Sequence, residues 1–190
     1  MNIVFRADAS IFIGSGHIMR CLVLAKQLSN YGHEVIFATK PQTGDFISYI
    51  SNQGFKVIEL NPPGKVVKPS SSGDYSSWLQ GSWEDDANDF IVKSDKADLV
   101  IVDHYSLDIR WEKKVANKLN CKIIVIDDLV REHYADLIVD QTYGRNIKEY
   151  LSKNSRSHVL AGSEFALISP DFQLIRDENK RVSKHKNILV

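Results

Sequence analysis

A glycine-containing turn near the N-terminus carries the histidine that is best placed for chemistry. The segment Gly14-Ser15-Gly16 precedes His17, and apolar residues then recur at helical spacing. Glycine permits positive φ and lets a ligand approach the backbone without meeting a Cβ, which we expect at Gly14 and Gly16. The first turn of a helix also presents unpaired N–H groups and the positive end of its dipole. The segment therefore predicts an anion-binding turn at the start of a helix.

His17 lies where this turn becomes the helix. The positive helix end disfavours an imidazolium ion, so we expect a neutral ring that can accept a proton near neutral pH. Such a histidine can serve as a general base. It can equally cap or pack at the helix start, and a Gly-x-Gly-His turn alone does not separate the two interpretations.

Further polar residues follow other apolar segments. They are Asp8, Asp103, His104, Tyr105, Asp128 and Gln141. Ligands of open parallel sheets bind at the carboxyl ends of the strands, where these residues are expected to gather. Each also has a purely structural interpretation: Asp103 and Asp128 can cap helices, and Tyr105 can simply pack its ring. Together they favour a binding site.

Other common kinds of site lack their spacing. His17, Asp103, His104 and Asp128 are of metal-ligand type, but no HxxxH or HExxH pattern accompanies them. A G-x-S-x-G nucleophile elbow and the third glycine of a dinucleotide-binding loop are also missing. We therefore predict neither a metal nor another cofactor.

Short apolar segments alternate with helix-length segments along the chain. Strands are expected near residues 3–5, 35–37, 54–60, 98–103, 122–126, 135–139 and 157–161, and helices near 17–28, 46–52, 83–94, 107–119 and 170–181. This alternation predicts an α/β fold with a parallel sheet. Residues 61–81, rich in Pro, Ser and Gly, are expected to form a long loop, either a lid or a disordered insertion.

The composition limits the remaining classes. Lys plus Arg and Asp plus Glu number 24 each, so the net charge of zero favours neither nucleic acid nor an anionic membrane as a partner. Cys21 and Cys121 form no paired motif, as in a reducing cytoplasm. The sequence shows no signal peptide and no apolar segment of the ~20 residues that a membrane span needs.

The last residues change character. A domain of residues 1–182 is followed by a basic linker and a short apolar segment, residues 183–190. An unpaired strand is an unusual end for a domain, so we expect 183–190 to begin a second domain.

Several of these motifs together resemble the PseG family, the UDP-2,4-diacetamido-2,4,6-trideoxy-β-L-altropyranose hydrolases of pseudaminic acid biosynthesis, and the related SpsG-like spore-coat proteins. The resemblance spans Met1 to about Phe172. The segments that carry it are Phe5–Ser10, Ile13–Ala25, Val102–Tyr105, Asp127–Leu129, Asp140–Gln141 and Leu160–Leu167.

The resemblance implies an architecture. The family resembles MurG and other GT-B glycosyltransferases, which have two Rossmann-like domains with a cleft between them. This chain would then be the N-terminal, catalytic half, a Rossmann-like parallel sheet with helices on both faces. The nucleotide-binding C-terminal domain would be missing from it.

The resemblance also implies a reaction, in which water displaces UDP at the anomeric carbon with inversion. His17 would activate the water, and Asp8 or Asp103 would orient the imidazole of His17. Tyr105 would touch the sugar or its amide groups. Arg20 would either pair with Asp8 or approach the ligand. The implied substrate-binding residues are Gly14, Ser15, Gly16, Arg20, Asp103, His104, Asp128 and Gln141.

Two other functions fit the same motifs. A glycosyltransferase of this fold would use His17 to deprotonate an acceptor hydroxyl instead of water. A non-catalytic module would bind a nucleotide sugar without turnover.

Overall fold

The computed structural model describes residues 1–178, so the predicted linker and strand at 183–190 lie outside the described residues. Its centre is a seven-stranded parallel sheet in the order β3-β2-β1-β4-β5-β6-β7. The strands are β1 (Asn2–Ala7), β2 (Glu34–Thr39), β3 (Lys56–Glu59), β4 (Leu99–Asp103), β5 (Lys122–Ile126), β6 (Leu137–Asp140) and β7 (His158–Ala161). All seven were expected from the sequence.

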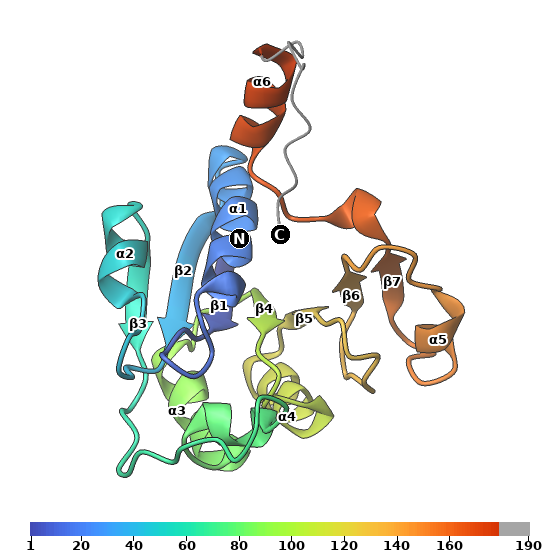
Figure 1. Cartoon of the computed structure of the whole chain (residues 1–190). Helices are drawn as coiled ribbons and strands as arrows, with labels where there is room; N and C mark the ends of the chain where they lie inside the picture. The colour runs from blue at the N-terminus through green and yellow to red at the C-terminus, as the bar shows by residue number, and fades with distance from the viewer. Residues whose placement is uncertain (179–190) are drawn as a thin grey trace.

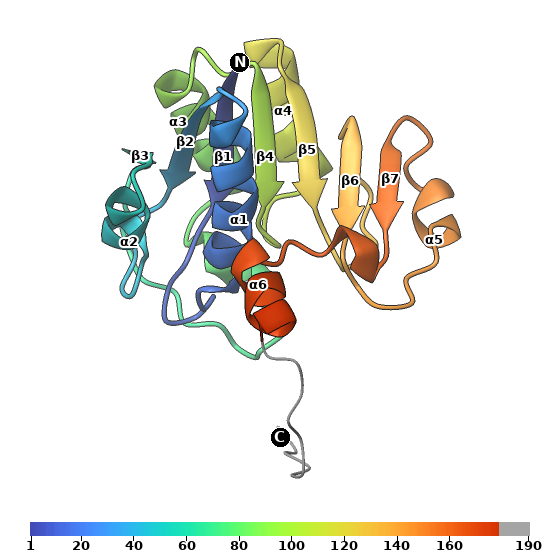
Figure 2. The same cartoon turned by 90° about the horizontal axis from the view of Figure 1, so that it is seen from above.

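Helices cover both faces of this sheet. They are α1 (Gly16–Asn30), α2 (Ile47–Asn52), α3 (Trp83–Lys93), α4 (Ile109–Leu119), α5 (Lys148–Leu151) and α6 (Pro170–Glu178), with 3-10 turns η1 (Tyr75–Leu79) and η2 (Ser163–Phe165). Figures 1 and 2 show α1 and α2 on one face and α3 and α4 on the other. The α/β, Rossmann-like prediction is confirmed. Within residues 1–178, every helix is too short or too polar to cross a bilayer.

The strand order reverses between β1 and β4, which is where an open α/β sheet binds ligands. Parallel pairing sets Ala7 opposite Asp103, so the last residues of these two strands are neighbours. The turn after β1 leads directly into α1. The fold thereby brings the glycine turn and the end of β4 to the same edge of the sheet.

Each face of the sheet has its own apolar core. On the α1 side, Phe5 stacks on Phe37 with ring centroids 5.0 Å apart. On the α3 and α4 side, Phe90 meets the fully buried Trp111 edge to face at 5.1 Å. Burial on both faces explains why the central strands are almost continuously apolar.

The long loop of residues 61–81 contains one 3-10 turn, η1, and is held by side-chain hydrogen bonds on either side of that turn. The carboxylate of Asp74 accepts hydrogen bonds from the hydroxyls of Ser76 and Ser77 at 2.8 and 2.7 Å, next to η1. Farther along, the Gln80 amide bonds both the N–H and the carbonyl of Val67 at 2.6 Å. These local side-chain bonds order the loop and fix where η1 lies.

A fully buried arginine joins three elements beneath the site. The Arg6 guanidinium on β1 binds Asp8 at 2.5 Å and Asp86 of α3 at 2.7 Å. Asp86 also accepts from the Trp111 indole at 3.0 Å and lies 3.2 Å from the Lys40 ammonium. Burial raises the pKa of Asp86, but the charge of Arg6 outweighs this effect and holds that pKa below its ordinary range.

A second buried network lies under β5 and β6. His133 Nδ1 is 2.8 Å from Glu112 Oε1, and Nε2 is 3.4 Å from Asp127 Oδ2. Burial lowers the pKa of His133, but the two carboxylates outweigh it and raise that pKa from 6.5 to about 9. The folded protein therefore holds a charged histidine between two acids near neutral pH.

Replacing Asp86 with alanine tests the first network. In the Asp86→Ala variant the buried guanidinium of Arg6 loses one of its two carboxylate partners. We therefore expect a loss of ~3–5 kcal/mol in the free energy of unfolding. Urea unfolding followed by circular dichroism measures it. Glu84→Ala, on the exposed face of the same helix, is the matched control and should cost under ~1 kcal/mol. Equal losses in the two variants would contradict this account of Arg6.

The second network predicts a pH-dependent stability. Because the pKa of His133 is raised on folding, the protonated ring stabilises the folded state. This contribution to the free energy of unfolding is complete below about pH 6.5 and disappears as the pH rises through about 9. That contribution is at most ~3 kcal/mol for a difference of this size. The unfolding free energy of the parent protein, measured against that of His133→Gln, should fall between these pH values. A constant difference from pH 6 to 10 would refute the assignment.

Candidate active site

The centre of the site is a histidine–carboxylate pair formed by α1 and β4. His17 is the second residue of α1, and Asp103 is the last residue of β4. The ring nitrogen Nδ1 lies 2.6 Å from Asp103 Oδ1. An ionised carboxylate only accepts, so this shorter contact favours a proton on Nδ1, although Arg20 Nη2, which is itself a donor, lies 3.1 Å from the same nitrogen. In the neutral ring the lone pair is then on Nε2, to which no residue within 1–178 hydrogen-bonds.

Arg20 completes this pair from one helical turn further along α1. Its Nε and Nη2 donate to the two oxygens of Asp103, each at 2.5 Å. Burial raises the pKa of Asp103, but the hydrogen bonds from Arg20 and His17 outweigh it and hold that pKa below its ordinary range. Asp103 is therefore an anion, and Arg20 pairs with it and not with Asp8.

Aromatic rings surround the imidazole. Tyr105 meets it edge to face with centroids 4.8 Å apart, and Trp78 does so at 5.9 Å. Trp78 and Tyr105 stack at 5.6 Å, and Tyr75 contacts both. The His17 side chain keeps 9% of its surface exposed. The rings thus fix the orientation of the imidazole while one part of it stays accessible.

Sequence reasoning missed Tyr75 and Trp78 as members of the site. Both belong to η1, inside the loop that looked irregular. The one available indication was that a tryptophan in a polar loop must be buried somewhere. Which partner it packs against depends on contacts distant in sequence.

Tyr105 is held in place by its own partners. Its hydroxyl donates to Asp128 Oδ1 at 2.6 Å, and the Arg131 guanidinium lies 5.9 Å from its ring centroid. Arg131 also donates to the Tyr105 carbonyl oxygen at 2.8 Å. Burial, and then the negative charge of Asp128, raise the pKa of Tyr105. The phenol is thus a protonated donor at neutral pH, and its predicted contact with substrate stays a prediction.

Of the two carboxylates predicted as alternatives for orienting His17, the structure places Asp103 and not Asp8 against it. Asp8 is fully buried and binds Arg6, the Thr39 hydroxyl at 3.0 Å and the Lys40 backbone N–H at 2.8 Å. His104 Nε2 lies 3.2 Å from the same carboxylate. Asp8 and His104 therefore form a network that supports the strand ends, apart from the imidazole.

Burial determines the charge of His104. Its side chain is 1% exposed, and burial lowers its pKa below 6.5, although Asp8 opposes that change. Its Nδ1 accepts a hydrogen bond from the Ser106 N–H at 3.1 Å. This bond leaves Nε2 of the neutral ring to face Asp8 as a donor.

The glycine turn is open toward its surroundings. Gly14 has the expected positive φ of 78°, whereas Gly16 already belongs to α1 and does not. A Cβ added at either glycine meets nothing within 4 Å. Ser15 is the N-cap residue of α1, but its side chain makes no capping bond. Free space and unpaired N–H groups thus coincide at this helix end.

Gln141 has a partner within the fold. Its amide oxygen accepts the Leu167 N–H at 3.0 Å and so fixes the segment after β7. Its predicted contact with substrate stays a prediction. Within residues 1–178, no group of three or more His, Cys, Asp or Glu side chains is arranged to hold a metal ion.

Comparisons with known proteins place these motifs in a wider group. No family model matches the chain. It is 30% identical over 181 residues to the UDP-2,4-diacetamido-2,4,6-trideoxy-beta-L-altropyranose hydrolase of Campylobacter jejuni, covering 95% of this chain and 56% of that protein. It is 23% identical over 195 residues to the spore coat polysaccharide biosynthesis protein SpsG of Bacillus subtilis, covering all of this chain and 50% of that protein.

The chain spans about half the length of these two relatives. Among solved structures, MurG of Acinetobacter baumannii superposes with a TM-score of 0.48 at 14% identity, covering 84% of this chain and 44% of that one. The sequence similarity to the hydrolase covers 95% of this chain. The chain is therefore similar to this hydrolase and to SpsG over about half of their length, and its own fold is a Rossmann-like α/β domain.

Proposed function

We propose that the protein containing this chain hydrolyses a UDP-linked 2,4-diacetamido-2,4,6-trideoxyhexose at the anomeric carbon, in nucleotide-sugar metabolism of the pseudaminic acid type. One observation carries the proposal: the Nδ1–carboxylate contact of His17 and Asp103 at the start of α1. Similarity to a UDP-sugar hydrolase supports the substrate class. Similarity to SpsG supports a role in polysaccharide precursor chemistry.

The geometry suits a general base. Nε2 of His17 takes a proton from a water molecule while the water oxygen forms a bond to the anomeric carbon. The bond between that carbon and the diphosphate oxygen breaks, and UDP leaves with the electron pair. Attack from the face opposite to UDP inverts the configuration. Asp103 accepts the Nδ1 hydrogen bond throughout and stabilises the imidazolium that forms.

The other groups position these reactants. Arg20 fills the remaining acceptor sites of Asp103, which keeps that carboxylate ionised and fixed. The exposed turn from Gly14 to Gly16 and the N-terminal end of α1 face the charge that develops on the diphosphate. The uridine is held by a second, nucleotide-binding domain of the complete protein, so that this chain is the N-terminal half of a GT-B-type enzyme.

Turnover without an acceptor tests the proposal. Full-length protein incubated with the diacetamido UDP-sugar alone should release UDP and free sugar in equal amounts, measured by chromatography and NMR. His17→Ala should lower kcat/KM by ~10²-fold or more, since the base is lost. The matched control is His158→Ala, an exposed histidine on β7.

Each other outcome has a defined meaning. UDP release that requires an added acceptor hydroxyl would identify a glycosyltransferase. Binding without turnover would identify a non-catalytic module. Full activity in His17→Ala would show that another group activates the water.

Substitutions of the two buried carboxylates, Asp103 and Asp8, should affect different properties of the protein. Asp103→Asn removes the acceptor that orients Nδ1–H, so kcat should fall by about 10²-fold or more. Asp8→Asn weakens the network around Arg6, so its main effect should be on the free energy of unfolding. Measuring kcat and urea unfolding for both variants compares the two effects. A larger fall in kcat for Asp8→Asn than for Asp103→Asn would contradict this assignment.

A further inference from the structure

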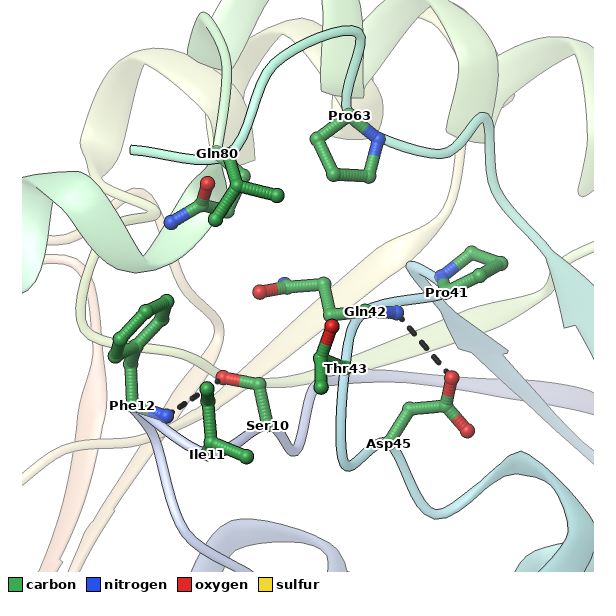
Figure 3. A pocket seen from close by; sticks show the side chains of 10 residues that line it. Ser10, Ile11, Phe12, Pro41, Gln42, Thr43, Asp45, Pro63 and Gln80 are labelled. Carbon is green, nitrogen blue, oxygen red and sulfur yellow. Dashed lines mark hydrogen bonds between the residues drawn. The ribbon is translucent and has the colours of Figure 1, made fainter. Parts of the chain in front are cut away.

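A cavity of about 430 Å³ lies next to the glycine turn (Figure 3). Three segments enclose it: the start of the turn after β1, the loop between β2 and α2, and the long loop of residues 61–81. Its volume is in the range of small-molecule sites. Its lining includes Phe12, Gln42, Thr43, Asp45, Pro63 and Gln80.

The walls of this cavity are fixed by backbone contacts. The Ile11 N–H donates to the Thr43 carbonyl oxygen at 3.0 Å and so joins the first two segments. Gly44 has a φ of 79°, and a Cβ there would come within 2.9 Å of the Ile11 side chain. On the third wall, Gln80 is bonded to Val67. These contacts of the fold therefore fix the shape of the cavity.

Its charge is unsuited to a phosphate. Among the described residues, 1–178, the lining includes neither lysine nor arginine, and Asp45 is its one charged residue. The two oxygens of Asp45 accept the backbone N–H groups of Gln42 at 3.2 Å and Ile47 at 3.1 Å. A fixed carboxylate repels a diphosphate, so the cavity suits an uncharged group.

Two polar atoms in the lining are available to such a group. Within residues 1–178, neither Gln42 Oε1 nor Thr43 Oγ1 has a hydrogen-bond partner. Figure 3 shows the Gln42 amide reaching into the space between Phe12 and Gln80, with the Thr43 hydroxyl below it. An acceptor and a hydroxyl donor side by side match the N–H and the carbonyl of a secondary amide. Phe12 and Pro63 offer apolar surface for the acyl methyl group.

Trp78 connects the lining of the cavity to the imidazole. Gln42 Nε2 donates to the Trp78 carbonyl oxygen at 3.3 Å, and the Trp78 ring lies edge-on to His17 at 5.9 Å. Phe12 belongs to the same turn as His17. A sugar whose anomeric carbon is near His17 therefore has this cavity as the neighbour of its ring substituents.

We propose that this cavity is a specificity subsite that binds an acylamino substituent of the substrate hexose through Gln42 and Thr43. The inference rests on the proposed function, since it names the group that distinguishes the substrate. The diphosphate stays outside the cavity, at the open turn. Selection arises because a hydroxyl substituent forms neither the paired hydrogen bonds to Gln42 and Thr43 nor the apolar contact of the acyl methyl group with Phe12 and Pro63.

Binding of two nucleotide sugars tests this subsite without turnover. UDP-N-acetylglucosamine and UDP-glucose share their UDP and differ at one substituent, acetamido against hydroxyl. Full-length protein should bind the acetamido sugar ~10-fold more tightly by calorimetry, in line with one or two neutral hydrogen bonds. Saturation-transfer NMR should detect the acetyl methyl group against the protein.

Variants assign the preference to the cavity. Thr43→Val and Gln42→Leu should each reduce the preference to about 3-fold or less. Gln27→Leu, an exposed glutamine on α1, is the matched control and should keep it. Gly44→Ala, which acts from the backbone, should also reduce it. Circular dichroism shows whether each variant is folded.

The possible outcomes are distinct. Equal affinity for the two sugars, no binding of either, or a preference that survives in folded Thr43→Val and Gln42→Leu would overturn the subsite. A selective binder that releases no UDP from the diacetamido sugar would instead refute the proposed hydrolysis and leave the subsite standing.

Discussion

The site depends on a buried negative charge at the end of β4. Asp103 has no exposed surface, and an isolated carboxylate there would be severely destabilising. Its two charged or ionisable ring and guanidinium partners, His17 and Arg20, lie three residues apart on α1, so one helical face supplies both. The thiol of Cys21, from the same helix, lies 3.5 Å from the carboxylate. The same contacts that compensate the charge also fix the imidazole. Stability and the geometry of the proposed base therefore have one cause.

The buried carboxylate that follows the neighbouring strand, β1, is compensated by different groups. Asp8, at the end of β1, is compensated by Arg6 from its own strand and by groups from β2. None of these partners of Asp8 comes from α1. Asp8 therefore stabilises the edge of the sheet, whereas Asp103 binds the helix. The two acids at adjacent strand ends thus have different roles because a different arginine pairs with each: Arg6 with Asp8, and Arg20 with Asp103.

The periodic features of the chain made the fold predictable. Apolar segments identified all seven strands, and the helical spacing after His17 located α1. Sequence could not decide whether Asp8 or Asp103 contacts His17, because that depends on how β1 and β4 are paired. It also missed α5, whose four residues are too short for a periodic pattern, and η1, which is ordered by contacts far along the chain.

The loop of residues 61–81 shows why such contacts matter for function. Its low apolar content is typical of an insertion, yet it places Trp78 against His17 and Gln80 in the lining of the cavity. Trp78 accepts a hydrogen bond from Gln42 through its backbone and packs on the imidazole through its ring. A change in this loop would therefore alter the proposed base and the proposed subsite together. In the proposed mechanism, substrate choice and reactivity are coupled through this segment, to which the mechanism assigns no catalytic group.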